Sequence, residues 1–209
     1  LRCGSNQITS LDVSNNTALT DLNCEDNQLT SLDVSNNPAL EILWCGSSGS
    51  NQITSLDVSN NTALTQLWCG NNQIITLDLS NNTALYSLQC FSNQLTTLDV
   101  SNNPALHLLS CWNNQLTNLD ISNNTALSAL WCQDNQLTSL DVRNGNNTNM
   151  MDLNLDITNN PNLFCIDVDD VVWSTSNWTS IDPQYYFSTN CNPSAIQEHT
   201  TNKELLKVT

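Results

Sequence analysis

The chain has 209 residues, of which 20 are Asp or Glu and only 4 are Lys or Arg, so its formal net charge is −16. This balance argues against a nucleic-acid ligand and against a polybasic membrane-surface anchor, because both need clustered Lys and Arg. No apolar run approaches the ~20 residues that cross a bilayer, which argues against a membrane-spanning segment.

A repeat of 21 residues organises most of the chain and is clearest at residues 19–39, LTDLNCEDNQLTSLDVSNNPA. Each unit contains one pattern twice: Leu22-x-Cys24-xx-Asn27 is followed by the same spacing in residues 29–37. Apolar residues that alternate with polar ones predict a short strand with one buried face, and the Asn after it predicts a turn. Two strands per unit predict two parallel sheets around a thin core. Since one unit cannot bury its apolar face alone, the array is expected to fold as a whole.

Seven cysteines follow the repeat, one in each unit. They are Cys3, Cys24, Cys45, Cys69, Cys90, Cys111 and Cys132, spaced by 21 residues except for one step of 24, where residues 46–50 contain a three-residue insertion. We interpret them as buried thiols in one inward column, because Cys is among the residue types most often buried. Neighbours would lie ~4.8 Å apart and point the same way, whereas a disulfide needs Cβ atoms ~3.8 Å apart. Metal ligation is disfavoured, since single cysteines lack the paired CxxC geometry of zinc sites.

The nested pattern, LxxLxCxxN followed by LxxLDVxxN, resembles the leucine-rich repeat family and specifically its short subclass with a 21-residue unit. The resemblance covers residues 1–163 and implies an all-β-dominated leucine-rich repeat solenoid with two parallel sheets. It also implies an interaction scaffold at the cell surface or outside the cell far more often than an enzyme. Residues 156–161, DITNNP, still match residues 33–38, DVSNNP, so we expect one last partial coil there.

Residues 164–192 lose the repeat and gain aromatic residues, and we expect them to form a C-terminal cap. An open solenoid end would expose apolar core and unpaired strand edges, and the segment resembles the caps that follow such repeats in secreted bacterial proteins. Cys165 and Cys191 stand outside the cysteine column and are expected to form a disulfide across the cap; two unrelated free thiols are the alternative. The acids within residues 167–170 are interpreted as solvated loop residues, with cation binding as the alternative.

Residues 193–209 are polar and then become amphipathic. They form either a tail or the truncated start of a C-terminal sorting domain, and they resemble that of the type IX bacterial secretion pathway. Together with the capped repeat array, this resemblance predicts a secreted protein or one at the bacterial cell surface.

The outward positions of the second strand hardly vary between units. The middle position is always Asp, which places seven carboxylates in one file: Asp12, Asp33, Asp57, Asp78, Asp99, Asp120 and Asp141. Adjacent carboxylates ~4.8 Å apart repel one another, but neighbouring Ser and Thr hydroxyls can donate hydrogen bonds to them, so a structural ladder is the favoured interpretation. The alternative is a ladder that binds cations, with Ca²⁺ as the candidate because it takes several oxygen ligands.

The outward positions of the first strand differ in every unit and carry large aromatic side chains. The candidate ligand-binding residues are Trp44, Trp68, Tyr86, Phe91, His107, Trp112 and Trp131. A row of exposed aromatic residues beside acids and amides is typical of a recognition surface, and flat rings also suit stacking on sugars. The alternative is that these side chains only cover neighbouring strands or mediate self-association.

No catalytic site is predicted, because His107 and His199 have no repeat-related partner and the ladder carboxylates all share one environment. The sequence also lacks the common metalloprotease, serine hydrolase, phosphate-loop and dinucleotide motifs. We therefore expect a non-enzymatic extracellular recognition module for a polysaccharide or a protein, with no cofactor unless the Asp ladder binds Ca²⁺. The alternatives are a self-associating structural or adhesive surface rod and, more weakly, an accessory domain of a larger secreted enzyme. Ice or mineral binding is disfavoured because an ionised Asp interrupts each row of hydroxyls.

Overall fold

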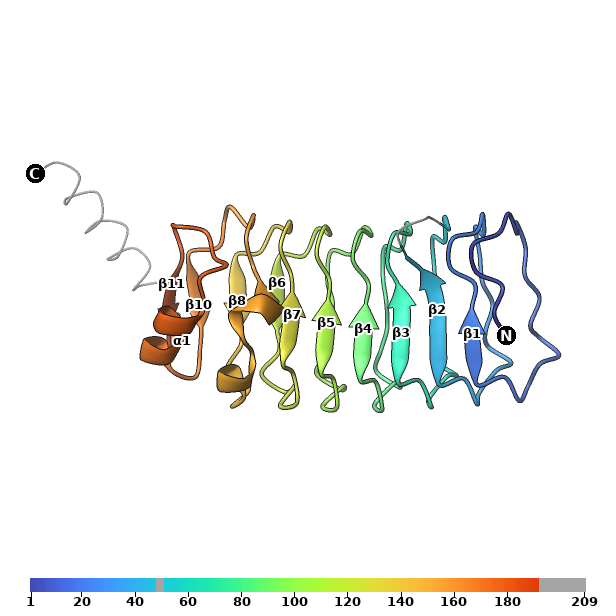
Figure 1. Ribbon diagram of the computed structural model, residues 1–209, viewed down its shortest axis with the longest axis horizontal. Coiled ribbons are helices and arrows are strands. Elements are labelled where there is room, and N and C mark those ends of the chain that lie inside the picture. The colour runs from blue at the N-terminus through green and yellow to red at the C-terminus, as the bar shows by residue number, and fades with distance from the viewer. Residues whose placement is uncertain (48–50, 192–209) are drawn as a thin grey trace, which may run out of the picture.

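The computed structural model describes residues 1–47 and 51–191, so the predicted tail or sorting segment at 193–209 lies outside the described residues. The coils stack along one axis into an elongated array, with the first coil at one end and the cap at the other (Figure 1). None of the helices within the described residues has the length and apolarity that a bilayer crossing requires.

The first strands of the coils form a seven-stranded parallel sheet. Its strands, in order, are β1 (Asp21–Asn23), β2 (Ile42–Gly46), β3 (Gln66–Cys69), β4 (Ser87–Gln89), β5 (Leu108–Ser110), β7 (Ala129–Trp131) and β9 (Leu155–Asp156). The buried leucine of each strand pairs with that of the next, as Leu67 does with Leu88, which keeps every apolar side chain on the inner face. The register shifts once, between Trp44 and Gly46, just before the three-residue insertion.

The second strands form a four-stranded parallel sheet. It comprises β6 (Asn118–Asp120), β8 (Ser139–Asp141), β10 (Cys165–Asp167) and β11 (Tyr186–Ser188). Earlier coils keep the same inward residues, such as Leu32 and Val34, but their segments are not paired as strands in the described part of the chain. The predicted solenoid with two parallel sheets is confirmed, although the second sheet is regular only toward the cap.

The cysteine column lies in the core. Cys24, Cys45, Cys69, Cys90, Cys111 and Cys132 are fully buried, Cys3 in the first coil is half-buried, and all seven are free thiols. Burial raises the pKa of the Cys24 thiol to about 12 and raises that of the deeper thiols further, because a thiolate has no solvation there. The prediction of an inward column of buried thiols is confirmed for the six cysteines from Cys24 to Cys132, whereas Cys3 is only partly buried.

The asparagines that close the first strands connect each coil to the one before it. Asn93 donates from Nδ2 to the carbonyl oxygens of Cys69 and Cys90, and its Oδ1 accepts from the backbone N–H of Ile74. The same bonds recur at Asn72 and Asn114. These buried amides are therefore part of the backbone bonding of the solenoid, rather than turn residues alone.

The last coil of the solenoid pairs with a sheet that its local sequence does not indicate. Residues 156–161 were matched to a second-strand segment, but β9 joins the first sheet, with Leu155 against Leu130 and Asp156 against Trp131. The expected last partial coil is confirmed, and a long-range bond decides which sheet it joins: Oδ1 of Asn160 accepts from the N–H of Leu137, as Oδ1 of Asn135 does from Leu116 in the preceding coil. β10 then continues the second sheet, placing Asp167 against Asp141.

The cap closes this end with a helix and a final strand. Two 3₁₀ turns, η1 (Asn147–Asn149) and η2 (Asp152–Asn154), precede β9, and helix α1 (Val171–Asn177) lies between β10 and β11. Trp178 is buried after α1 and donates from Nε1 to the carbonyl of Met150 at 2.7 Å. A disulfide joins Cys165 to Cys191, so the cap covers the last apolar layer and is tied to the second sheet.

Candidate functional site

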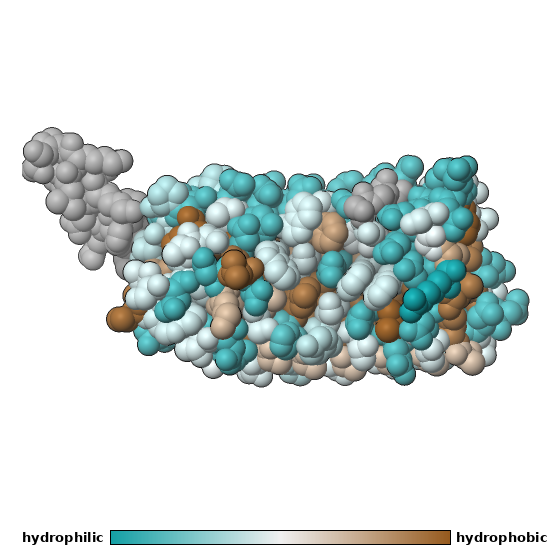
Figure 2. All heavy atoms as spheres, viewed as in Figure 1, coloured by the Kyte–Doolittle hydropathy of each residue, from teal (hydrophilic) through white to brown (hydrophobic). Residues whose placement is uncertain are grey.

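The outward face of the first sheet gathers all seven predicted ligand-binding side chains. Trp44, Trp68 and Trp131 occupy the middle outward position of β2, β3 and β7. The other four flank β4 and β5: Tyr86 and His107 directly before these strands, Phe91 and Trp112 two residues after them. Figure 2 views this face and shows hydrophobic residues interrupting a mostly hydrophilic surface.

The aromatic side chains are stacked in pairs across neighbouring strands. The ring centroids of Trp44 and Trp68 lie 4.3 Å apart with 8° between planes, and Phe91 and Trp112 lie 4.7 Å apart with 3° between planes. These distances are close to the ~4.8 Å between parallel strands, so the rings stack along the array axis. Each pair therefore turns its ring faces toward one another and presents ring edges to solvent.

Glycines beside the tryptophans make this packing possible. A Cβ atom on Gly70 would lie 2.8 Å from the ring of Phe91, so the missing side chain makes room for that ring over β3. Trp68 donates from Nε1 to Ser87 Oγ at 3.3 Å, whereas Nε1 of Trp44 is buried with no hydrogen-bond partner among the described residues. The comparison of repeats did not single out Gly70 or Ser87; the available signal was that Gly70 stands one unit before Phe91 and Trp112 in the same column.

Tyr86 and His107 form the third stacked pair, with centroids 5.0 Å apart and 21° between planes. The Ser128 hydroxyl lies 3.0 Å from Nδ1 of His107, which joins a potential nucleophile to a potential base. Among the described residues no carboxylate hydrogen-bonds to either group, so the orienting member of a catalytic triad is not present there. His199 lies outside the described residues.

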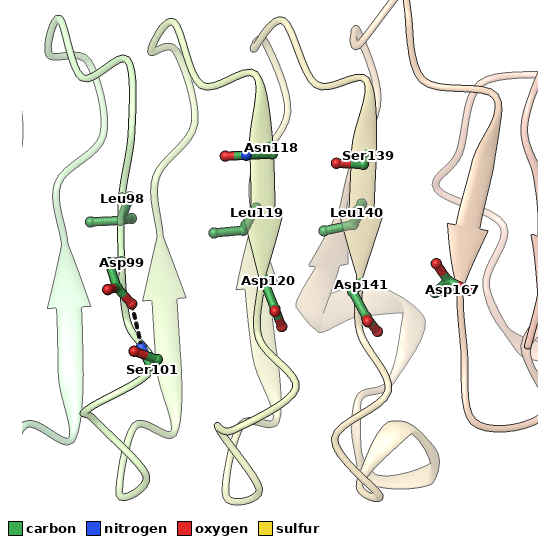
Figure 3. A pocket seen from close by; sticks show the side chains of 10 residues that line it. All are labelled: Leu98, Asp99, Ser101, Asn118, Leu119, Asp120, Ser139, Leu140, Asp141 and Asp167. Carbon is green, nitrogen blue, oxygen red and sulfur yellow. Dashed lines mark hydrogen bonds between the residues drawn. The ribbon is translucent and has the colours of Figure 1, made fainter. Parts of the chain in front are cut away.

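The second face carries the Asp column, in which each carboxylate closes the turn that follows its strand. Asp99 accepts from the backbone N–H of Ser101 at 2.9 Å (Figure 3), and the same bond recurs in the other coils, as at Asp78 and Asp120. Hydrogen bonds from the Ser101 hydroxyl and backbone hold the pKa of the Asp99 carboxyl below its usual range. A groove of about 480 Å³ runs along this face. Its floor consists of Leu98, Leu119 and Leu140, and the neighbouring Asp carboxylates border it.

The last carboxylate of the column is neutralised by an arginine. Arg143 stands where earlier coils carry Ser, and its guanidinium pairs with Asp141 and lies 3.8 Å from Asp167. Its Nη1 also donates to the carbonyl of Thr189, which ties the column to the cap. In the cap, Asp169 accepts from backbone N–H groups of the 145–147 turn and Asp170 caps α1, so both acids bond to the backbone.

Metal coordination lacks a preformed geometry in the part of the chain that the structure describes. Within residues 1–47 and 51–191 no group of three or more His, Cys, Asp or Glu side chains is placed to hold a metal ion. The ladder carboxylates already accept turn hydrogen bonds, which orients them along their own coils. Calcium binding by Asp12, Asp33, Asp57, Asp78, Asp99, Asp120 and Asp141 stays a prediction.

Solved structures with the same architecture are leucine-rich repeat proteins. The functional domain of InlJ from Listeria monocytogenes, described as including a cysteine ladder, is 39% identical with a TM-score of 0.68, over 87% of this chain and 38% of that one. The internalin InlF from the same organism is 25% identical with a TM-score of 0.58, over 81% and 49%. A leucine-rich repeat protein from Leptospira interrogans is 20% identical with a TM-score of 0.62, over 88% and 53%.

These likenesses establish the fold as a leucine-rich repeat solenoid. The chain spans between about a third and a half of the solved proteins just named, so their full length contains regions with no counterpart in the sequence given. The chain matches no protein-family model and no curated protein sequence. The fold is therefore shown, and its ligand has to be argued from the faces of the solenoid.

Proposed function

We propose that the chain is a non-enzymatic recognition module that binds a protein ligand through the outward face of its first sheet. One observation carries this proposal: the two faces derive from the same repeat, yet only the first differs from coil to coil. Residues that only maintain the solenoid can repeat, as the Asp column does. A surface that recognises one ligand needs a particular arrangement of large anchors, and Trp and Tyr are the residue types that supply them.

The stacking geometry favours a protein over a polysaccharide. A sugar ring binds well to an aromatic ring whose flat face is turned to solvent. In the pairs Trp44–Trp68 and Phe91–Trp112, the rings cover one another's inner faces and offer edges outward. A ridge of aromatic edges beside amides suits the apolar and polar side chains of a protein surface. Polysaccharide binding remains the second candidate, because the stacking within a pair covers only one face of each ring.

The neighbours and the disulfide support this proposal. A plant receptor ectodomain of the same fold, 21% identical to this chain, was solved in complex with Casparian strip integrity factor 2, so the fold can bind a protein. Disulfides persist in oxidising compartments, and Cys165–Cys191 is such a bond. We therefore propose a location outside the cell or at a bacterial cell surface, with residues 193–209 as either a tail or the truncated start of a type IX sorting domain.

Binding measured on a protein microarray and on a glycan microarray tests the ligand class. The biotinylated chain is applied to an array of extracellular proteins and to a glycan array, together with Trp68→Ala, Trp131→Ala and the second-face control Thr97→Ala. We expect protein ligands whose affinity falls at least about tenfold in the tryptophan variants, or about 1.4 kcal/mol, and is unchanged in the control. Binding confined to glycans, or equally strong in all variants, would contradict the proposal.

Self-association is measured on the same samples. Sedimentation velocity over a range of concentrations distinguishes a monomer from a rod that assembles through the aromatic face. Concentration-dependent oligomers that disappear in Trp68→Ala would favour the structural or adhesive role over ligand recognition.

A further inference from the structure

Six of the aromatic side chains border one area of the first-sheet face, which we call the aromatic frame. The frame consists of Trp68, Tyr86, Phe91, His107, Trp112 and Trp131. β3, β4, β5 and β7 pair in this order, so Trp68 and Trp131 are separated by three strand spacings, or roughly 14 Å. The stacked pairs Tyr86–His107 and Phe91–Trp112 lie at opposite ends of β4 and β5.

The area inside the frame carries smaller side chains. Gln89 and Ser110 stand in register between Trp68 and Trp131, and Ser110 is only 5% exposed. One face of the Trp68 ring is covered by Trp44, so its other face is directed along the array toward Gln89. A side chain that enters between the two tryptophans would therefore meet the indole face of Trp68 that Trp44 does not cover.

Charge on and beside this sheet is almost entirely negative. Asp156 follows Trp131 in register on the next strand, Asp134 lies at the turn after β7, and Glu41 directly precedes β2. The described residues include two Arg and no Lys: Arg2 in the first coil and Arg143. Arg143 is paired with Asp141 on the second face, so no Lys or Arg of the described residues lies inside the frame or on its borders.

We propose that the aromatic frame binds a cationic protein segment, with an Arg or Lys side chain seated against Trp131 beside the carboxylate of Asp156. This inference rests on the proposed function and names the chemistry of its partner. A guanidinium stacks on an indole face and pairs with a carboxylate at once, and Trp131 has an acid one strand spacing away. An apolar side chain of the same segment lies over Gln89 and Ser110, between Trp68 and Trp131. The acids on both borders attract basic residues that flank it.

A phage-displayed library of disulfide-constrained random peptides is the probe. It is panned on the immobilised chain, and the enriched peptides are synthesised and measured by calorimetry at two salt concentrations. We expect enriched sequences with a net positive charge and an aromatic or aliphatic residue. Their affinity falls at least about tenfold in Trp131→Leu, which retains an apolar side chain, and less in Asp156→Asn.

Asp78→Asn is the matched control for charge. It removes one carboxylate from the second face, and in both Asn variants the new amide oxygen can still accept the turn hydrogen bond that the carboxylate accepts. Affinity unchanged in Asp78→Asn but reduced in Asp156→Asn supports the frame. An equal loss in both variants would show general attraction to a chain of charge −16 and would overturn the inference.

The remaining outcomes separate the two proposals. Neutral or acidic peptides that still require Trp68 and Trp131 would overturn the cationic partner and leave the recognition face intact. Peptides that bind all frame variants equally, or a library with no enrichment, would count against both the partner and the face. Circular dichroism and melting curves of each variant verify that it is folded.

Discussion

The first and second sheets come from the same repeat, yet they differ in how completely their backbone is hydrogen-bonded and in how much their outward residues vary. The first sheet has seven paired strands and outward residues that change in every coil, whereas the second has four paired strands and a repeated Asp. The first-strand asparagines also bond to the backbone with both amide atoms. The sheet with more backbone hydrogen bonds is thus the one with the variable face. Because those bonds hold the strands together, the outward side chains of this sheet are free to differ.

The asparagines of the second strands are bonded less completely. Asn103 donates from Nδ2 to the carbonyls of Leu79 and Asn82, but its buried Oδ1 has no partner among the described residues. The same holds for Asn37, Asn61, Asn82 and Asn124. A buried acceptor without a partner costs stability, so this edge of the solenoid is expected to open first. The predictions below test that difference.

The largest effect is expected from the asparagines themselves. Asn93→Ala leaves a buried N–H and several carbonyls without their amide partner and should lower the free energy of unfolding by about 3 kcal/mol. Asn103→Ala removes only two donated bonds and should cost about 1 to 2 kcal/mol. Urea denaturation measures both; equal losses would refute the difference between the two edges.

Gly46→Ala is expected to come next. A Cβ atom there would collide with the carbonyl oxygen of Gly70, which is backbone and cannot rotate away, so we expect a loss of roughly 2 kcal/mol. Gly70→Ala is the matched control, since its Cβ would meet the movable ring of Phe91, and the loss should be smaller. Hydrogen exchange of β2 and β3 locates the damage; protection that is unchanged in Gly46→Ala would contradict this packing.

Acid is expected to weaken the second face selectively. Hydrogen bonds from Ser80 and Ser101 lower the pKa of Asp78 and Asp99 in the folded chain. Groups with a lowered folded pKa stabilise the fold above their unfolded pKa of about 4, and this contribution is lost as the pH falls through the folded value. Melting temperatures should therefore decline below about pH 4.

The ladder variants separate turn bonding from repulsion. Asp78→Asn keeps an acceptor for the N–H of Ser80 and relieves repulsion along the file, so its melting temperature at neutral pH should stay level or rise. Asp78→Ala loses the acceptor and should melt a few degrees lower. A melting temperature for Asp78→Asn that falls as far below the wild type as that of Asp78→Ala would show that the charge itself is needed, as a cation-binding ladder requires.

The smallest effect is expected on the first face. Trp44→Phe keeps a stacked ring beside Trp68 but removes the buried indole N–H that has no partner among the described residues, so stability should change by less than about 1 kcal/mol. The exciton signal of the stacked indoles should vanish from the circular dichroism spectrum. Trp173→Phe, which alters the edge-on pair Trp173–Trp178 in the cap, should leave that signal in place.

Much of the fold could be predicted from local pattern. Alternation of apolar residues identified Leu67 and Cys69 as inward and Trp68 as outward, and the burial of these residues agrees. The last partial coil expected at residues 156–161 is present, but DITNNP and DVSNNP are equivalent locally, so the match does not predict which sheet that coil joins. Only the long-range bond between Asn160 and Leu137 distinguishes them.

The sequence predicted which aromatic side chains share the outward face but not their geometry, and ligand binding by them stays a prediction. The residues of the aromatic face follow from strand alternation, whereas their pairing into stacks depends on rotamers and on the space left by Gly70. The sequence left a polysaccharide and a protein as equal candidates, and that pairing supports the proposal of a protein, since it decides which parts of the rings meet solvent.

The sequence by itself determined the repeat, the inward columns and the variable face, because each follows from a period of two within a strand and of 21 residues along the chain. Only the tertiary structure decided which asparagine amides are fully bonded, which sheet the last coil joins and how the rings are turned. Those features depend on contacts between residues about 20 positions apart, and such contacts exist only once the coils are stacked.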